Sequence, residues 1–402
     1  MRSSIVFLCT NWWRTERIMP VIKQLSITHD ILILALGAAN LNSINENRQV
    51  DVIKEEMHSL NKDHAYTVWS NRVTNERGVS IWYESDIENV LTSLVNELDR
   101  VSTFNVDCVI YDDSRTAGHQ VPKIIFEPFY EEMKKRNIPV IANIHGNVDN
   151  ERLWKFVALE QGKIYDKLCI YGEYDRNRLK AYDIDNHIMT TGIPSNDLIR
   201  AEVKTDSHIL IVLNRVDFDG MTTDMTIVEN LQINDLWQRY RLPVVFKVKP
   251  PPRIIDSSEK NKEEAALVHL LQSMVTKNRA SLDPNMPLVI TADEYAENWL
   301  ISNSKCIISY GSTMCLKALQ VDKPTVIIRE MGNVANFENY HGTISVHEDF
   351  FNVLDKWEDK KEERDKFLKE TLEGAAEFNS TGLYLESVYG VIDEWKQKNT
   401  NQ

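Results

Sequence analysis

The segment Ile308–Ala318, ISYGSTMCLKA, joins a short apolar run to a helical stretch through Gly311, Ser312 and Thr313. Glycine permits a tight backbone turn, and a serine or threonine at a helix start can cap the first amides. The amides left free there, together with the helix dipole, favour a bound phosphate group. The segment therefore predicts a phosphate-binding turn, with an ordinary helix cap as the alternative.

Two cations follow apolar runs elsewhere in the chain. In the segment VVFKVKPPPR, Lys249 stands at the end of the expected strand and on the same face as Lys247, because strand side chains alternate. Arg215 follows the run HILIVLN, where its planar fork could grip a phosphate. Either cation could offset the negative charge of a leaving group, and solvated side chains are the alternative.

Three residues could move protons. His145 in PVIANIHGN directly follows an apolar run, and a histidine pKa near neutrality suits a general base. A histidine bonded to a loop carbonyl is the alternative. Asp112 and Asp113 follow the run VDCVIY. Neighbouring side chains point different ways, so one of the two could be the base, while helix capping is the simpler interpretation.

Trp12, Trp13 and Arg14 follow the first apolar run and are expected in a loop. Aromatic faces can stack on sugar rings, although tryptophans more often pack in a core.

Short β-branched runs alternate with helical stretches along the chain. Continuous apolar runs are typical of strands buried on both faces of a parallel sheet, so the alternation indicates an α/β protein with doubly wound sheets. The expected strands are Ser4–Cys9, Ile31–Leu36, Val106–Tyr111, Pro139–His145, Lys167–Tyr171, His187–Thr191, His208–Asn214, Val244–Val248, Leu288–Thr291, Cys306–Tyr310, Thr325–Arg329 and Thr343–Val346. The expected helices include Arg17–Leu25, Pro122–Arg136, Asp175–Tyr182, Met225–Tyr240, Glu263–Thr276 and Thr313–Leu319.

A polar link at 201–207, AEVKTDS, precedes a fresh strand and marks a domain boundary. We predict one domain over 1–203, a second domain over 204–380, and a C-terminal helix over 381–402 that can cross back onto the first domain. Ligands of open α/β sheets bind at the carboxyl ends of the strands, so a central cleft between the domains is the expected site.

The chain has 402 residues, and 60 acidic against 46 basic residues give a net charge of −14. This balance argues against a simple polyanion binder and gives a nucleic-acid acceptor no support. No apolar run approaches the ~18 residues of a membrane span, and the first residues are too polar for a signal-peptide core.

The five cysteines form no CxxC pair, and their number is odd. Neither a disulfide framework nor a zinc knuckle is indicated, and buried reduced thiols in a cytoplasmic protein are expected.

Three blocks together resemble a known family: FLCTNWWRTERIMPVIKQL, CIYGEYDRNRLKAYDIDNHIMTTGIPSNDLI and VITADEYAENWLISNSKCIISYGSTMCLKALQVDKPTVIIRE. Their order and spacing are similar to GT-B proteins, in the branch of UDP-N-acetylglucosamine 2-epimerases, CDP-glycerol glycerophosphotransferases and surface-polysaccharide glycosyltransferases. The resemblance covers patches amounting to about half of the chain. It implies two Rossmann-like doubly wound domains, an acceptor domain over 1–203 and a nucleotide-sugar domain over 204–380, and it places Trp12, Trp13 and Arg14 on the acceptor side. It also implies a nucleotide diphosphate on Gly311, Ser312 and Thr313, and no required metal or other cofactor.

Two positions depart from the family pattern for ribose binding. Lys317 stands where many members have a carboxylate, and it could pair with phosphate or face solvent. Glu330, after the run TVIIR, could replace that carboxylate as a ribose or sugar contact, or remain a solvated loop residue.

Other departures separate the branches. The resemblance implies a histidine in epimerases where this chain has Asn214, and the segment NIHGNVDNE does not show the epimerase pattern of glutamates. Glycerophosphotransferases have a Lys-Pro-His-Pro-like motif where prolines follow Lys249. A His-Gly pair like His145-Gly146 recurs in the transferases, which implies acceptor activation by His145.

The favoured interpretation is a metal-independent glycosyltransferase that uses a nucleotide sugar, with UDP as the expected nucleotide. Its acceptor would be a glycan, a lipid-linked saccharide or another hydroxyl-bearing polymer. The alternatives are a UDP-sugar 2-epimerase, a CDP-glycerol-type phosphotransferase, and a non-catalytic protein that binds nucleotide sugars or glycans.

Overall fold

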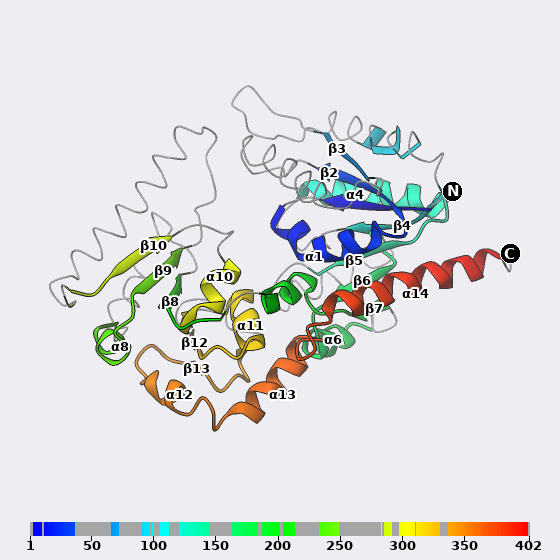
Figure 1. Cartoon of the computed structure of the whole chain (residues 1–402). Helices are drawn as coiled ribbons and strands as arrows, with labels where there is room; N and C mark the ends of the chain where they lie inside the picture. Colours follow the sequence, from blue (N-terminus) through cyan, green and yellow to red (C-terminus); the bar gives the residue numbers. More distant parts are fainter. Residues whose placement is uncertain are drawn as a thin grey trace. The chain divides into compact units, whose positions relative to one another are not determined.

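The computed structural model divides the chain into two compact units, each with its own parallel sheet (Figure 1). Unit 1 comprises Met1–Asp197 and Thr371–Gln402, and unit 2 comprises Leu198–Glu370. The sequence-based boundaries followed residues 203 and 380. The structure describes residues 3–9, 12–36, 66–71, 91–92, 94–96, 98–99, 105–111, 120–144, 163–183, 187–201, 204–213, 233–248, 283, 285–291, 297–309, 311–329 and 337–400.

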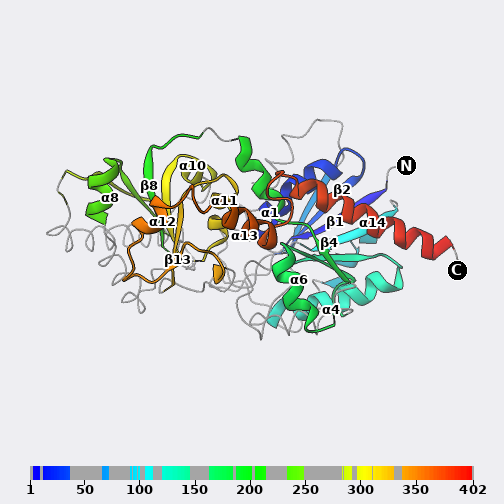
Figure 2. The same ribbon diagram turned by 90° about the horizontal axis from the view of Figure 1, so that it is seen from below.

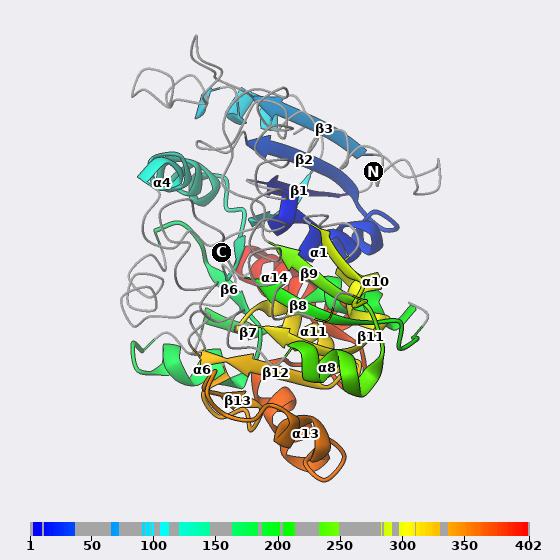
Figure 3. The same ribbon diagram turned by 90° about the vertical axis from the view of Figure 1, so that its left-hand side faces the viewer.

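The sheet of unit 1 has seven strands in the order β3-β2-β1-β4-β5-β6-β7. All neighbouring strands are parallel and lie side by side (Figure 3). The strand order reverses between β1 and β4, as in dinucleotide-binding folds. The strands are β1 Ser4–Cys9, β2 Asp30–Leu36, β3 Tyr66–Asn71, β4 Val106–Tyr111, β5 Val140–Asn143, β6 Lys167–Ile170 and β7 Ile188–Thr190.

Helices cover both faces of this sheet (Figure 2). Helices α1 (Trp12–Leu25) and α14 (Ser380–Thr400) pack on one face, where their apolar side chains join those of β1, β2 and β4 in one core. Helix α4 (Gln120–Lys135) lies on the other face, and the Phe126 ring stacks on Tyr111 with centroids 4.6 Å apart. Burial on both faces explains why the strands are continuous apolar runs.

The last helix is fastened to unit 1 at its first turn. Asp197 accepts hydrogen bonds from the backbone amides of Ser380 at 3.2 Å and Thr381 at 2.7 Å. Asp197 lies in the short 3-10 helix η2 (Pro194–Ala201). A carboxylate at this place satisfies amides that the helix cannot bond itself and complements the helix dipole.

The sheet of unit 2 has six parallel strands in the order β10-β9-β8-β11-β12-β13. Counted from β8, this is the same order as in unit 1, with the reversal between β8 and β11. The strands are β8 His208–Leu213, β9 Val244–Val248, β10 Leu288–Thr291, β11 Ser304–Ser309, β12 Thr325–Ile328 and β13 Thr343–Ile344.

Two pairs of helices cover the two faces of this second sheet. Helices α8 (Ile233–Tyr240) and α12 (Phe351–Asp355) share a core with Ile209, Phe246 and Ile308. Helices α10 (Glu297–Ser302) and α11 (Thr313–Gln320) pack together and against β11. Helix α13 (Lys361–Thr371) is held by Arg364, whose guanidinium lies 3.6 Å from the Trp357 ring centroid.

The predicted α/β class with two doubly wound parallel sheets is confirmed. Every expected strand is present, and β3 is an additional strand that the sequence did not predict. The expected helix 263–276 lies outside the described residues. All five cysteines are buried, and none of them forms a disulfide bond. Among the helices that the structure describes, none combines the length and apolar character needed to cross a bilayer.

Candidate functional site

The candidate site in unit 2 lies where the strand order of the sheet reverses. Strands β8 and β11 are neighbours, and the chain leaves β11 through Gly311 into α11. Ligands of open α/β sheets bind at the carboxyl ends of strands at such a reversal point. The Gly-Ser-Thr turn identified from the sequence therefore stands at the position that this fold uses for ligands.

The turn has the geometry of a capped helix start at which two backbone amides lack a hydrogen-bond acceptor among the described residues. Ser312 has extended backbone angles, and its hydroxyl oxygen accepts a hydrogen bond from the Met314 amide at 3.3 Å. The Cys315 amide donates to the Ser312 carbonyl at 2.9 Å. Within the described part of the chain, the amides of Ser312 and Thr313 have no acceptor. The turn can thus cap its helix and still offer two donors to an anion.

The thiol of Cys315, in the first turn of α11, is not a nucleophile. Burial raises its pKa to about 12, although the nearby Ser309 hydroxyl and the Ser312 backbone oppose this shift. The neutral thiol packs against the sheet, so it can hold α11 in place but cannot attack a substrate.

Lys317 does not face solvent. Its ammonium donates to Glu297 Oε1 at 2.8 Å and to Asn298 Oδ1 at 3.4 Å, and its side chain is 12% exposed. Both partners lie on α10. The lysine thus joins α10 to α11, beside the candidate turn, and this pairing with a carboxylate is one the sequence analysis had not considered.

Lys247 is a cation that the sequence analysis noted only as a neighbour of Lys249. It is the penultimate residue of β9 and is 6% exposed. The available sequence signal was a single lysine inside the otherwise apolar strand VVFKV.

Several predicted site residues lie outside the described residues: Asp112, Asp113, His145, Arg215, Lys249 and Glu330. The sequence suggested a loop for Trp12, Trp13 and Arg14, but these three residues form the first turn of helix α1. Of these three residues the structure describes only the backbone. In the described ranges, no three His, Cys, Asp or Glu side chains are grouped so that they could hold a metal ion.

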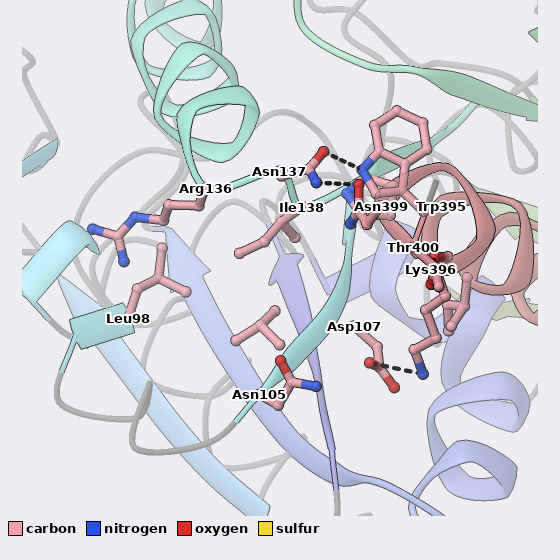
Figure 4. Close-up of a pocket in the computed structure, with 13 residues that line it drawn as sticks. Leu98, Asn105, Asp107, Arg136, Asn137, Ile138, Trp395, Lys396, Asn399 and Thr400 are labelled. Carbon is pink, nitrogen blue, oxygen red and sulfur yellow. Dashed lines mark hydrogen bonds and ion pairs between the residues drawn. The ribbon is translucent and has the colours of Figure 1, made fainter. Parts of the chain in front are cut away.

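A cavity of about 710 Å³ lies in unit 1, at the amino ends of β4 and β5 (Figure 4). The end of α14 covers it: Lys396 pairs with Asp107 at 3.1 Å, and the Trp395 indole donates to Asn137 at 3.1 Å. None of the predicted site residues lines this cavity. It lies at the amino ends of the strands, whereas such folds bind ligands at the carboxyl ends.

Comparisons with known proteins identify the fold. The sequence matches no family model and no curated protein. The structure is similar to the UDP-GlcNAc 2-epimerase of Neisseria meningitidis bound to UDP-GlcNAc, with a TM-score of 0.61, 14% identity, and coverage of 96% of this chain and 100% of that one. It is also similar to the UDP-GlcNAc 2-epimerase of Methanocaldococcus jannaschii, with a TM-score of 0.57, 16% identity, and coverage of 92% of this chain and 93% of that one. A putative UDP-N-acetylglucosamine 2-epimerase from Listeria monocytogenes has a TM-score of 0.60 and 9% identity, with coverage of 98% of both chains.

Identities this low establish similarity of fold. The resemblance to the GT-B and UDP-N-acetylglucosamine 2-epimerase-like superfamily, which the sequence predicted, is confirmed at that level. The chain has two Rossmann-like domains and spans nearly the full length of these structures.

Proposed function

We propose that this protein is an enzyme that binds a nucleotide sugar, with the diphosphate on the Gly311-Ser312-Thr313 turn. The observation that carries the proposal is the pair of amides, Ser312 and Thr313, left without an acceptor among the described residues at the carboxyl end of β11. Oriented amides and the helix dipole bind phosphate oxygens without a metal ion. UDP is the expected nucleotide, because the fold is shared with proteins solved with UDP-GlcNAc.

The reaction we propose is transfer of the sugar to a hydroxyl group. His145, or one of Asp112 and Asp113, removes the proton of the acceptor hydroxyl, whose oxygen attacks the anomeric carbon. The bond from that carbon to the diphosphate breaks, and the helix amides with Lys249 or Arg215 stabilise the departing charge. In this scheme Trp12, Trp13 and Arg14 contribute to the acceptor side, and Glu330 to the ribose or sugar. The acceptor is a glycan, a lipid-linked saccharide or a similar polymer.

A sugar-nucleotide 2-epimerase is the second candidate, and the fold comparison supports it because both epimerases of assigned function are similar over more than nine tenths of this chain. Two features count against it: Asn214 stands in place of a histidine, and the epimerase pattern of glutamates is absent after residue 143. Epimerisation proceeds by elimination and re-addition and needs acid and base groups at those places.

The first experiment measures thermal stabilisation by UDP, CDP, GDP and TDP and their sugar conjugates, without added metal. Selective stabilisation by one nucleotide is expected, because a ligand that binds the folded state raises the unfolding temperature. A flat response at millimolar ligand would contradict the proposal and favour a protein without this activity.

A substitution at the turn tests the binding position. In Thr313→Glu a carboxylate enters the first turn of α11, where it favours the helix but repels a phosphate. We expect unchanged or higher stability without ligand, and UDP affinity lowered at least tenfold. Thr313→Gln has nearly the same shape without the charge and serves as the matched control. Equal UDP affinity of the two variants, measured by calorimetry, would place the diphosphate elsewhere.

The fate of the bound sugar nucleotide separates the two reactions. An epimerase converts UDP-GlcNAc to its C2 epimer without an acceptor, which proton NMR detects directly. A transferase leaves the C2 configuration unchanged and releases UDP when an acceptor is supplied. In the transferase, His145→Ala should abolish turnover while donor binding persists.

A further inference from the structure

Lys247 is a cation inside the sheet of unit 2. It lies one residue before the carboxyl end of β9, and its exposed fraction is 6%. The apolar stem of this side chain is buried, while the ammonium group at its tip keeps contact with solvent. Among the described residues, no hydrogen bond or ion pair satisfies this side chain. A lysine held by its buried stem, with its ammonium group available at the carboxyl end of the sheet, can bind an anion there.

The strand register places Lys247 in the same cross-strand row as the residue that leads into the candidate turn. Lys247 is opposite Val212 of β8, and Val212 is opposite Ser309 of β11. Partners in register point to the same face of a sheet, and neighbouring strands lie about 4.8 Å apart. Lys247 therefore lies about 10 Å from Ser309 across the row, and Ser309 is two residues before Gly311. Figure 3 shows β9, β8 and β11 as successive strands.

This row faces the side of the sheet that carries α11. Phe246, the neighbour of Lys247 in the strand, joins the core with α8 and α12 on the opposite face. Ser309 contacts the Cys315 thiol of α11. Since side chains alternate along a strand, Lys247 shares the α11 face with Ser309. On that face Glu297 is engaged by Lys317 at 2.8 Å.

We infer that Lys247 binds the diphosphate whose other oxygens lie on the amides of Ser312 and Thr313. The inference rests on the proposed function and identifies a further residue of the same site. The negative charge of a diphosphate is larger than a single helix terminus can neutralise. A lysine supplies the additional positive charge, as a point charge on a flexible four-carbon stem. The bound anion then pairs with this ammonium group, for which the described residues supply no partner.

Lys247→Met tests the inference through two effects of opposite sign. Methionine fills a similar volume without charge, so the protein without ligand should melt at the same or a higher temperature. UDP affinity, measured by calorimetry, should fall about 10- to 100-fold, the range for one charge-assisted hydrogen bond. Uridine affinity should stay unchanged because uridine has no phosphate. Lys305→Met, at the amino end of β11 where Lys305 pairs with Asp206 at 2.8 Å, is the control and should bind UDP normally.

The outcomes separate this inference from the proposed function. If the unmodified protein binds neither UDP nor inorganic pyrophosphate, both fail. A second outcome is that the unmodified protein binds UDP, that Thr313→Glu abolishes this binding, and that Lys247→Met leaves it unchanged. In that case only the role of Lys247 is refuted. If Lys247→Met and Lys247→Gln both fail to fold, the charge has a structural role and the inference is overturned. Pyrophosphate binding that depends on Lys247, without UDP binding, supports the anion site and rejects uridine as the base.

Discussion

Asp175 shows what burial does to a single carboxylate in unit 1. It lies in helix α6 (Glu173–Lys180), is 3% exposed, and accepts a hydrogen bond from the Tyr171 amide at 3.2 Å. Burial raises its pKa from 3.8 to about 7, although the amides of Tyr171 and Gly172 and the charge of Arg178 oppose the shift. The folded protein therefore holds this proton more tightly than the unfolded chain does.

The raised pKa of Asp175 predicts a stability that falls as the pH rises. The favourable contribution of the protonated carboxyl is complete below pH 3.8 and is lost as the pH rises through about 7. Asp175→Asn keeps an acceptor but cannot ionise. The original protein loses stability as Asp175 ionises, and the variant does not. The free energy of unfolding of the variant, minus that of the original protein, should therefore rise by about 3–4 kcal/mol from pH 4 to pH 8. Urea unfolding at both pH values measures this, with exposed Asp359→Asn as control. Parallel pH profiles for all three proteins would contradict the raised pKa.

At the scale of elements, two turns of unit 1 accommodate the segment that leads into α14. Gly192 after β7 has a φ of +69°, and a Cβ there would overlap the Glu373 carbonyl oxygen and the Ser380 hydroxyl. Gly172 after β6 is equally close to the Thr371 carbonyl. The Glu373 amide in turn donates to the Tyr171 carbonyl at 2.8 Å. The last helix thus depends on two glycines that allow close backbone approach.

A pair of glycine-to-alanine substitutions tests this close approach with opposite signs. Gly192→Ala combines a positive φ with a steric overlap and should cost about 2 kcal/mol or more. Gly390 lies within α14, and a Cβ there meets nothing within 4 Å. Gly390→Ala should therefore stabilise the protein by about 0.5–1 kcal/mol through helix propensity. Urea unfolding measures both; a Gly192→Ala protein as stable as the original would show that the turn rearranges freely.

At the scale of the whole molecule, unit 1 is completed by the far end of the chain. Tyr384, Val388, Val391 and Ile392 of α14 belong to the same buried core as β1 and α1. Burying four such side chains contributes roughly 6–12 kcal/mol, at about 1.5–3 kcal/mol each. This equals the net stability of a typical domain, about 5–15 kcal/mol. Unit 1 should therefore not fold without its last helix.

Truncation tests this dependence on the C-terminal helix. A chain ending at residue 379 lacks α14, and we expect the amides of β1, β2 and β4 to lose their protection in hydrogen exchange. Strands of unit 2 should remain protected, because α14 contributes nothing to their core. A chain ending at residue 397 keeps the four core side chains and is the control. Protection of β1 in the shorter chain equal to that in the control would refute the dependence.

The strands were predictable where both faces are buried, because a continuous apolar run is itself the local signal. β3, YTVWSN, is too polar to show it, and the start of α1 was missed because Trp12 and Trp13 have weak helix propensity. At the site, the turn after β11 was visible from three consecutive residues. Lys317 was assigned to phosphate or solvent because its partner, Glu297, lies on another helix.

By itself the sequence determined the α/β class, the positions of the strands other than β3, and the Gly-Ser-Thr turn after β11, since each depends on residues close together in the chain. Only the tertiary structure decided which strands are neighbours, which carboxylate pairs with Lys317, and that α14 completes the first unit. These depend on strand order and register, which bring together residues far apart in sequence and leave no local pattern. Lys247 illustrates the difference: the sequence shows a lysine in an apolar strand, and the register aligns it with the strand that carries the turn.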